Sequence, residues 1–353
     1  MHLKRDEWSM NQGFLDRHSK IHYIGKCIRH FNDETFIDRV LLADENPYEI
    51  EFVELGDNNP DKLIQIIPNI YYLDGFCAEF RNTLKLLAYA DRYGFIPYVL
   101  YDKNYVYKED TLIFGTDNPF EYYFNQTCDL TYESVMHSAN VVFSEKKHTK
   151  LIDLKCGISP YSYEMNRDNI NWLGAIYKKY IQINPFSMKK ITMDYENLLG
   201  GSIKVLGVHH RGTDYKKAYK YHPKYVTVEE KIAEVESIEE DYDRIFLATD
   251  DREAGELFRN RFGSKVCFYE DVYRGEGSVS VAFSLDGREN HKYLLGLEVL
   301  RDVYTLSLCE GLIAGISQVA YCAQIMKKGM GEEFSYFKII DKGINVSGPI
   351  FRA

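Results

Sequence analysis

The C-terminal half of the chain alternates short apolar runs with helical segments, and this alternation limits the fold more than any other feature. The apolar runs occupy Lys204–His209, Arg244–Ala248, Lys265–Tyr269 and Gly311–Gly315. Apolar residues at helical spacing follow them in the segments 229–240, 253–262, 293–308 and 317–326. Short strands separated by helices are joined by crossovers, which place the strands parallel in one sheet. The pattern therefore predicts an α/β fold with a doubly wound sheet.

A second α/β unit precedes this one. An apolar run at Ile66–Leu73 ends in Asp74-Gly75-Phe76, a helix is predicted over Ala78–Tyr93, and a strand follows at Ile96–Tyr101. This order is one βαβ unit and predicts a parallel sheet. Further along, the helical pattern of Asn171–Ile183 is predicted to break at Asn184-Pro185.

The chain has 353 residues, more than a single core usually serves. We therefore predict an N-terminal α/β domain at 1–190 and a C-terminal one at 200–353, with a binding cleft between them.

Charge and cysteine content narrow the class of protein. The net charge of -10 argues against a nucleic-acid binder, which normally has a basic surplus. The 7 cysteines are widely spaced and form no C-x-x-C pair, which disfavours a disulfide framework or a zinc site. No signal region or membrane-length apolar run is visible, so we expect a cytoplasmic protein without a transmembrane segment. These features do not exclude a peripheral contact between the protein and a membrane surface.

Polar clusters follow three of the predicted C-terminal strands, at His209–Tyr215, Thr249–Arg252 and Ile316–Gln318. Because the carboxyl ends of parallel strands meet at one edge of a sheet, these loops are expected to enclose a single ligand. In the first loop, the guanidinium of Arg211 suits a phosphate and would stabilise charge on a departing pyrophosphate. The structural alternative is an Arg–Asp pair in a polar loop.

The other two loops offer N–H groups that could bind an anion and carboxylates that could accept hydrogen bonds. Ser317, Gln318 and Val319 begin a helix whose free N–H groups would bind the same phosphates, although Ser317 is equally suited to a plain N-cap. Asp250 and Asp251 would hold a metal or accept hydrogen bonds from a ribose or purine; adjacent residues on a strand point in different directions, so we expect no metal. One of the two is expected to cap the next helix.

Asp302 lies on or near the apolar face of the predicted helix 293–308. A carboxylate in that position needs a partner from another element, or it lies at the edge of a site.

The residues of these loops resemble the peptide motifs of the α1,2/α1,6/protein-O-fucosyltransferase superfamily. The run His209-His210-Arg211-Gly212-Thr213-Asp214 resembles the first motif, and Thr249-Asp250-Asp251 resembles the second. Asp302 followed by Ser317–Tyr321 resembles the third. The resemblance covers about residues 203–326 and is nearest to the bacterial nodulation and core α1,6 enzymes. The N-terminal half matches weakly, through Gly75-Phe76 ahead of a long helix.

The resemblance implies a GT-B fold of two Rossmann-like domains and a hexosyltransferase that uses GDP-fucose as co-substrate. Transfer would be inverting and metal-independent, without a cofactor. Arg211 would clamp the β-phosphate, with His209 beside it as the second catalytic-site residue. Donor contacts are expected from Asp214, Asp250, Asp251, Asp302, Ser317, Gln318 and Val319. Of these, Gln318 would lie near the guanine or the sugar.

The chain also departs from the α1,6 enzymes. Gly212 stands where they have a second arginine, Tyr215 stands where they have a lysine, and their acid/base glutamate falls near Tyr219. The catalytic base is therefore open. An acceptor side is expected at Asp74, Gly75, Phe76 and Glu79, with Asp74 or Glu79 as the candidate base.

The expected acceptor is a glycan, for instance the precursor of a bacterial surface polysaccharide. Two alternatives remain open: a GT-B enzyme that uses another nucleotide sugar, and a non-catalytic module that binds nucleotide sugars.

Overall fold

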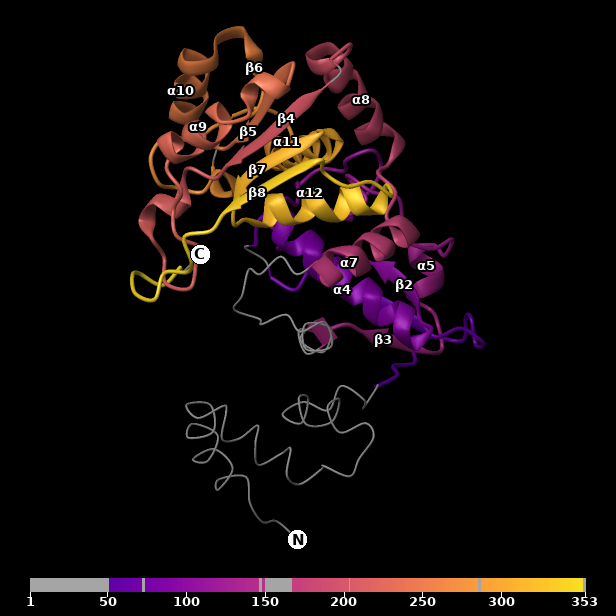
Figure 1. Ribbon diagram of the computed structural model, residues 1–353. Coiled ribbons are helices and arrows are strands. Elements are labelled where there is room, and N and C mark those ends of the chain that lie inside the picture. The colour runs from indigo at the N-terminus through magenta and orange to yellow at the C-terminus, as the bar shows by residue number, and fades with distance from the viewer. Residues whose placement is uncertain are drawn as a thin grey trace, which may run out of the picture.

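The computed structural model describes residues 51–71, 74–145, 148–149, 167–202, 204–284 and 287–351. These residues form two parallel β-sheets with helices packed around them (Figure 1). The N-terminal sheet has the order β2-β1-β3, and the C-terminal sheet has the order β6-β5-β4-β7-β8. The predicted α/β class with parallel sheets is confirmed. Residues 1–50 of the predicted N-terminal domain lie outside the described residues.

The N-terminal sheet consists of β1 (Ile64–Ile67), β2 (Ile96–Val99) and β3 (Val141–Phe143). Helix α4 (Phe76–Tyr93) connects β1 to β2 and ends at Gly94, whose φ of 71° is the left-handed conformation that glycine adopts without strain. The predicted strand Ile66–Leu73 is thus shifted toward the N-terminus. Pro68 explains the early end of β1, because a proline has no N–H to donate within a central strand.

The C-terminal sheet is covered on both faces. Its strands are β4 (Val205–His210), β5 (Arg244–Thr249), β6 (Val266–Cys267), β7 (Gly311–Gly315) and β8 (Tyr336–Ile340). Alternate residues of these strands face opposite ways: Leu206 and Ile245 join one buried cluster, whereas Val205 and Phe246 join another. The first cluster includes residues of α9 (Val228–Glu236) and α10 (Arg252–Phe262), and the second includes residues of α11 (His291–Leu308) and α12 (Gln318–Gly329). The sheet is therefore doubly wound, as predicted.

Two elements differ from the sequence prediction. A helix, α8 (Pro185–Leu199), begins where Asn184-Pro185 had predicted only a break. The Asn184 side chain accepts a hydrogen bond from Ser187 N at 2.8 Å, and Pro185 occupies the first turn, where a missing N–H costs nothing. The same two residues thus begin a helix. Strand β8 was not predicted either; it pairs in parallel with β7 at the edge of the sheet.

The two sheets are joined through packed helices. Helix α12 packs against α7 (Arg167–Tyr180) and α4, and it lies between the C-terminal sheet and these N-terminal helices (Figure 1). Glycines allow the close approach, because a Cβ atom at Gly329 would lie 2.4 Å from Cδ1 of Tyr177. One buried apolar cluster includes Phe80 of α4 as well as Phe246 of β5. The two halves therefore share a core.

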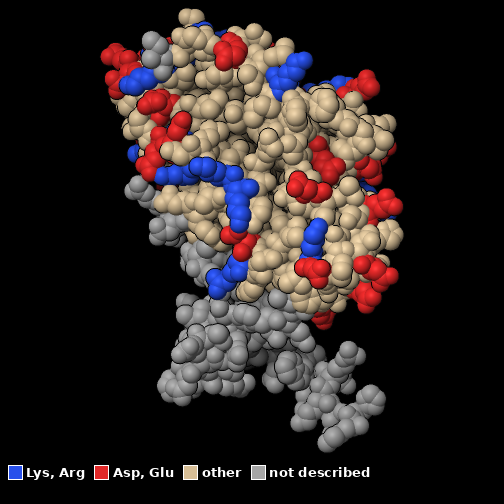
Figure 2. Space-filling model, turned by 90° about the vertical axis from the view of Figure 1, so that its right-hand side faces the viewer, with Lys and Arg blue, Asp and Glu red and all other residues tan. Residues whose placement is uncertain are grey.

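Among the described residues, no helix is both long and apolar enough to cross a membrane. The five cysteines of the described segments are all free, and Cys27 and Cys156 lie outside those segments. On the face shown in Figure 2, basic side chains lie close to acidic ones. That face therefore carries charges of both signs.

Candidate functional site

A cavity of about 570 Å³ lies at the carboxyl ends of β4, β5 and β7. Strand β4 is the point at which the strand order reverses, with β5 and β6 on one side and β7 and β8 on the other. Ligands of open α/β sheets bind at such a switch point. All three predicted loops contribute lining residues, and the N-terminal half contributes the beginning of α4. The structure thus brings the three loops around one cavity.

Arg211 lies at the end of β4, between two carboxylates. Its Nη1 is 2.8 Å from Oδ2 of Asp250, and its Nη2 is 2.7 Å from Oδ1 of Asp214. Nη2 also donates to Ser280 Oγ at 3.3 Å. Burial opposes the charge of the guanidinium, but Asp250 and Asp214 raise the pKa of Arg211 above its usual value. Arg211 is therefore a permanent, oriented cation in the cavity wall.

Asp250 bonds to three residues of the loop that follows β4. Its carboxylate accepts hydrogen bonds from Gly212 N at 2.8 Å and from Thr213 Oγ1 at 2.7 Å, in addition to the ion pair with Arg211. Burial works to raise the pKa of Asp250, but the Arg211 charge and these hydrogen bonds hold it below its ordinary value. In the described part of the chain, no three or more His, Cys, Asp or Glu side chains are grouped to hold a metal ion.

Asp251 has structural contacts next to the cavity. It caps α10 by accepting a hydrogen bond from Glu253 N at 3.2 Å, and it forms an ion pair of 2.6 Å with Lys216. It is not among the residues that line the cavity. Gly212 packs directly against it, since a Cβ atom at that position would lie 2.3 Å from Asp251 Oδ2. No side chain fits at Gly212 unless Asp251 moves.

His209 and Ser317 join the ends of β4 and β7. Ser317 Oγ lies 3.0 Å from Nδ1 of His209 and also accepts a hydrogen bond from Ala320 N at 3.1 Å, so it caps α12. Burial, assisted by the positive charge of Lys231, lowers the pKa of His209 well below its ordinary value. The imidazole is therefore neutral. The first residues of α12, Gln318 and Val319, line the cavity, where their end of the helix attracts anions.

Two polar groups on the cavity wall, Asp302 and Gln318, are available to a ligand. Asp302 of α11 lines the cavity, and burial raises its pKa to about 7 although the nearby charge of Arg301 opposes this shift. Oε1 of Gln318 is buried and meets no hydrogen-bond donor among the described residues. Buried polar groups are normally satisfied, so both are suited to a ligand with hydrogen-bond donors.

The N-terminal side of the cavity is formed by Asp74, Gly75 and Phe76. The amide of Phe76 donates to the hydroxyl of Tyr107, which also lines the cavity, at 3.2 Å. Glu79 lies elsewhere: it is fully buried, accepts hydrogen bonds from Ile70 N at 2.7 Å and Tyr71 N at 3.1 Å, and is absent from the cavity wall. Burial raises its pKa to about 8.

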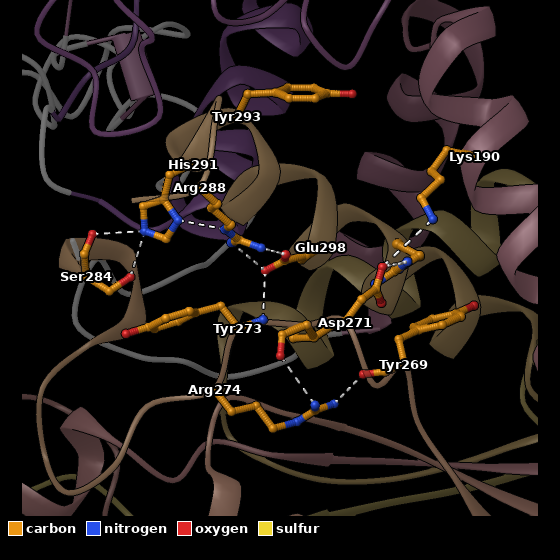
Figure 3. A network of polar contacts seen from close by, with 12 residues as sticks. Lys190, Tyr269, Asp271, Tyr273, Arg274, Ser284, Arg288, His291, Tyr293 and Glu298 are labelled. Atoms are coloured by element: carbon orange, nitrogen blue, oxygen red, sulfur yellow. Dashed lines mark hydrogen bonds and ion pairs between the residues drawn. The ribbon is translucent and has the colours of Figure 1, made fainter. Parts of the chain in front are cut away.

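A polar network supports the wall next to α11 (Figure 3). Glu298 lines the cavity, accepts a hydrogen bond from Tyr273 N at 3.1 Å and pairs with Nη1 of Arg288 at 2.5 Å. Nε of Arg288 donates in turn to His291 Nδ1 at 2.7 Å. These contacts tie the segment that carries Tyr273 to α11 and so shape the cavity.

Several residues that line the cavity are not predicted from the sequence, among them Arg81, Ser280 and Phe351. Phe351 arrives through the C-terminal tail, which pairs with the segment after β4: Lys220 N donates to Pro349 O at 2.9 Å. Its ring centroid lies 5.0 Å from that of Tyr219. No local pattern indicates this pairing. The sequence does offer a signal for Arg81, which lies in the second turn of the helix that follows Gly75.

No family profile and no curated protein matches the sequence. The chain is similar to solved structures of fucosyltransferases. For the NodZ α-1,6-fucosyltransferase soaked with GDP-fucose, the TM-score is 0.45 at 15% identity, covering 75% of this chain and 92% of that one. For NodZ from Bradyrhizobium the TM-score is 0.42 at 15% identity, covering 76% and 92%. For POFUT1 in complex with GDP it is 0.41 at 10% identity, covering 80% and 99%.

Proposed function

We propose that this protein is an inverting, metal-independent fucosyltransferase that moves fucose from GDP-fucose to a hydroxyl group of a glycan. The donor binds at the C-terminal sheet and the acceptor approaches from the side of Asp74, in a GT-B arrangement with the cavity between the halves. The observation that carries the proposal is the placement of Arg211 and the beginning of α12 in the wall of one cavity, at the switch point of a parallel sheet.

This placement suits a diphosphate. Arg211 is held in one orientation by Asp214 and Asp250, which leaves little side-chain entropy to lose when an anion binds. The free N–H groups at the beginning of α12 face the same cavity. The neutral imidazole of His209 adds a polar group without adding charge.

The reaction is a single displacement. The acceptor oxygen attacks the anomeric carbon of fucose from the face opposite the diphosphate, and the bond from that carbon to the β-phosphate oxygen breaks. Arg211 stabilises the negative charge that develops on the departing GDP. The proton of the acceptor passes to a carboxylate; of the two candidates, Asp74 lines the cavity, whereas both oxygens of Glu79 accept backbone hydrogen bonds.

The test compares wild-type protein with Arg211→Ala and Arg211→Lys. Removal of the guanidinium is expected to lower turnover of GDP-fucose at least 100-fold, about 3 kcal/mol of transition-state stabilisation. Lysine keeps the positive charge but lacks the paired N–H groups of the guanidinium. We therefore expect Arg211→Lys to be more active than Arg211→Ala and less active than wild type. Product is measured by mass spectrometry with a panel of glycan acceptors, and donor binding by titration calorimetry with GDP, GDP-fucose and UDP-sugars.

EDTA is expected to leave turnover unchanged. A loss of activity on chelation would contradict the metal-independent mechanism. If UDP-sugars bound as tightly as GDP-fucose or more tightly, the donor would be another nucleotide sugar. Binding of GDP-fucose without transfer or hydrolysis would identify a non-catalytic module.

A further inference from the structure

The charge around Arg211 does not by itself favour a diphosphate. Arg211 is in contact with two carboxylates, Asp214 and Asp250, so this group carries one more negative than positive charge. The imidazoles of His209 and His210 are kept neutral, chiefly by burial, which lowers the pKa of His210 to about 3 and that of His209 well below its ordinary value. An incoming diphosphate therefore needs positive charge from outside the Arg211 loop.

The loop itself has no room for that charge. A Cβ atom at Gly212 would lie 2.3 Å from Asp251 Oδ2, so the residue next to Arg211 cannot carry a longer side chain in this backbone. Lys216, one turn further on, forms an ion pair with Asp251 and does not line the cavity. Lys220, four residues further along the same segment, does line the cavity and supplies one positive charge. A further cation on the cavity wall comes from another element.

Arg81 of α4 lies on the wall of the same cavity. Its guanidinium carbon is 5.3 Å from the ring centroid of Tyr321, which belongs to the first turn of α12. No acidic partner for Arg81 is found within the described residues, and its buried Nε makes no hydrogen bond there. An aromatic face orients a guanidinium while its N–H groups stay available to an anion.

We propose that Arg81 is a second phosphate-binding residue of the cavity and contacts the diphosphate from the N-terminal half. This inference rests on the proposed function, since it assigns the donor's diphosphate to the end of the cavity between Arg211 and the start of α12. The diphosphate is then held by residues of both halves: Arg211 and α12 from the C-terminal half, Arg81 from α4. The donor would then contact both α4 and α12, which already pack against each other.

The experiment measures GDP affinity by titration calorimetry for wild-type protein, Arg81→Gln and Arg81→Lys. Arg92→Gln is the matched control, because Arg92 lies in the last turn of the same helix, is exposed and also stacks on a tyrosine, Tyr93. We expect Arg81→Gln to weaken GDP binding tenfold or more, as for the loss of a charge-assisted hydrogen bond. Arg81→Lys should retain part of the affinity, and Arg92→Gln should match wild type.

Guanosine, which has no phosphate, separates a phosphate contact from a general loss of structure. Its affinity, measured by NMR titration, is expected to be the same for wild type and Arg81→Gln. Equal GDP affinities of wild type and Arg81→Gln would overturn the role of Arg81 while leaving the proposed function intact. A parallel loss of guanosine and GDP binding would also overturn it. If the wild-type protein bound no GDP, both the role of Arg81 and the proposed function would be wrong.

Discussion

The ionisable side chains of the cavity are held in distinct protonation states by their surroundings. Arg211 stays charged because Asp250 and Asp214 outweigh the effect of burial. His209 stays neutral because it is buried and faces the charge of Lys231. Asp302, which burial brings to a pKa of about 7, is the one of these three that changes charge near neutral pH. Burial also lowers the pKa of Lys231, beside His209, to about 7. A pH-dependent step in ligand binding is therefore assigned to Asp302 only if it disappears when Asp302 is replaced.

GDP affinity is expected to fall as the pH is lowered from 8 to 6. Guanine presents N–H donors along one edge, and a carboxyl group accepts from them with both oxygens, and most strongly, when it is ionised. Because the pKa of Asp302 is raised to about 7, the ionised form dominates above that pH and is lost below it. Asp302→Asn should bind GDP about tenfold more weakly at pH 8 and lose this pH dependence. Titration calorimetry across the pH range tests this expectation.

Stability provides the control for this variant. An acid whose pKa is raised by folding destabilises the folded state when it ionises, so stability is lost as the pH rises from the unfolded pKa toward 7. Ligand-free Asp302→Asn should therefore be at least as stable as wild type at pH 8. If the variant kept the wild-type pH dependence of GDP binding, another group would have to carry it.

At the scale of elements, close helix packing joins the two halves. A Cβ atom at Gly174 of α7 would lie 2.7 Å from Cβ of Lys328 in α12 and 3.2 Å from the backbone N of Gly329. Gly329 makes the reciprocal approach to Tyr177. The beginning of α12 lines the cavity, so the packing of its other end against α7 helps to position that wall.

Gly174→Ala is expected to destabilise the protein by about 1–3 kcal/mol, the usual cost of overpacking. Helix propensity alone would favour alanine by about 1 kcal/mol, so the sign of the change distinguishes the two effects. Ala175→Ser, which adds one atom at an exposed position of the same helix, should change stability by less than about 0.5 kcal/mol. Urea denaturation measures both, and a more stable Gly174→Ala protein would contradict the close packing.

At the scale of the whole molecule, the two sheets do not have separate cores. The main apolar cluster contains Leu84 of α4 and Val142 of the N-terminal sheet together with Phe246 and Leu312 of the C-terminal sheet. Unfolding either half would expose the buried surface of the other. The halves are therefore coupled, although each has its own parallel sheet.

Thermal unfolding is expected to occur in a single transition. Calorimetry should give an enthalpy close to the van't Hoff value, as for one cooperative unit. GDP should raise the midpoint of this transition without splitting it, because in the proposed binding mode it contacts the folded state of both halves. Two resolved transitions, with GDP shifting one of them, would show that the shared cluster does not couple the halves.

Local patterns in the sequence predicted much of this architecture. The apolar runs at Arg244–Ala248 and Gly311–Gly315 correspond closely to β5 and β7, because alternating burial and helical periodicity are properties of neighbouring residues. Arg211, Asp250 and Ser317 follow three of the predicted strands and are therefore expected at one sheet edge, and the structure brings them around one cavity. Asn184-Pro185 was misread as a break, because these residues also begin helices and local composition does not separate the two cases.

By itself, then, the sequence determined the α/β class, the main strands and the edge at which polar loops collect, since each depends on residues close together in the chain. Only the tertiary structure decided which distant residues complete the cavity. Arg81 reaches it because α4 packs on α12, and Phe351 reaches it because the tail pairs with the segment after β4. Packing also confined Gly212 against Asp251 and buried Glu79 away from the cavity. Such contacts depend on how whole elements pack, which no local pattern encodes.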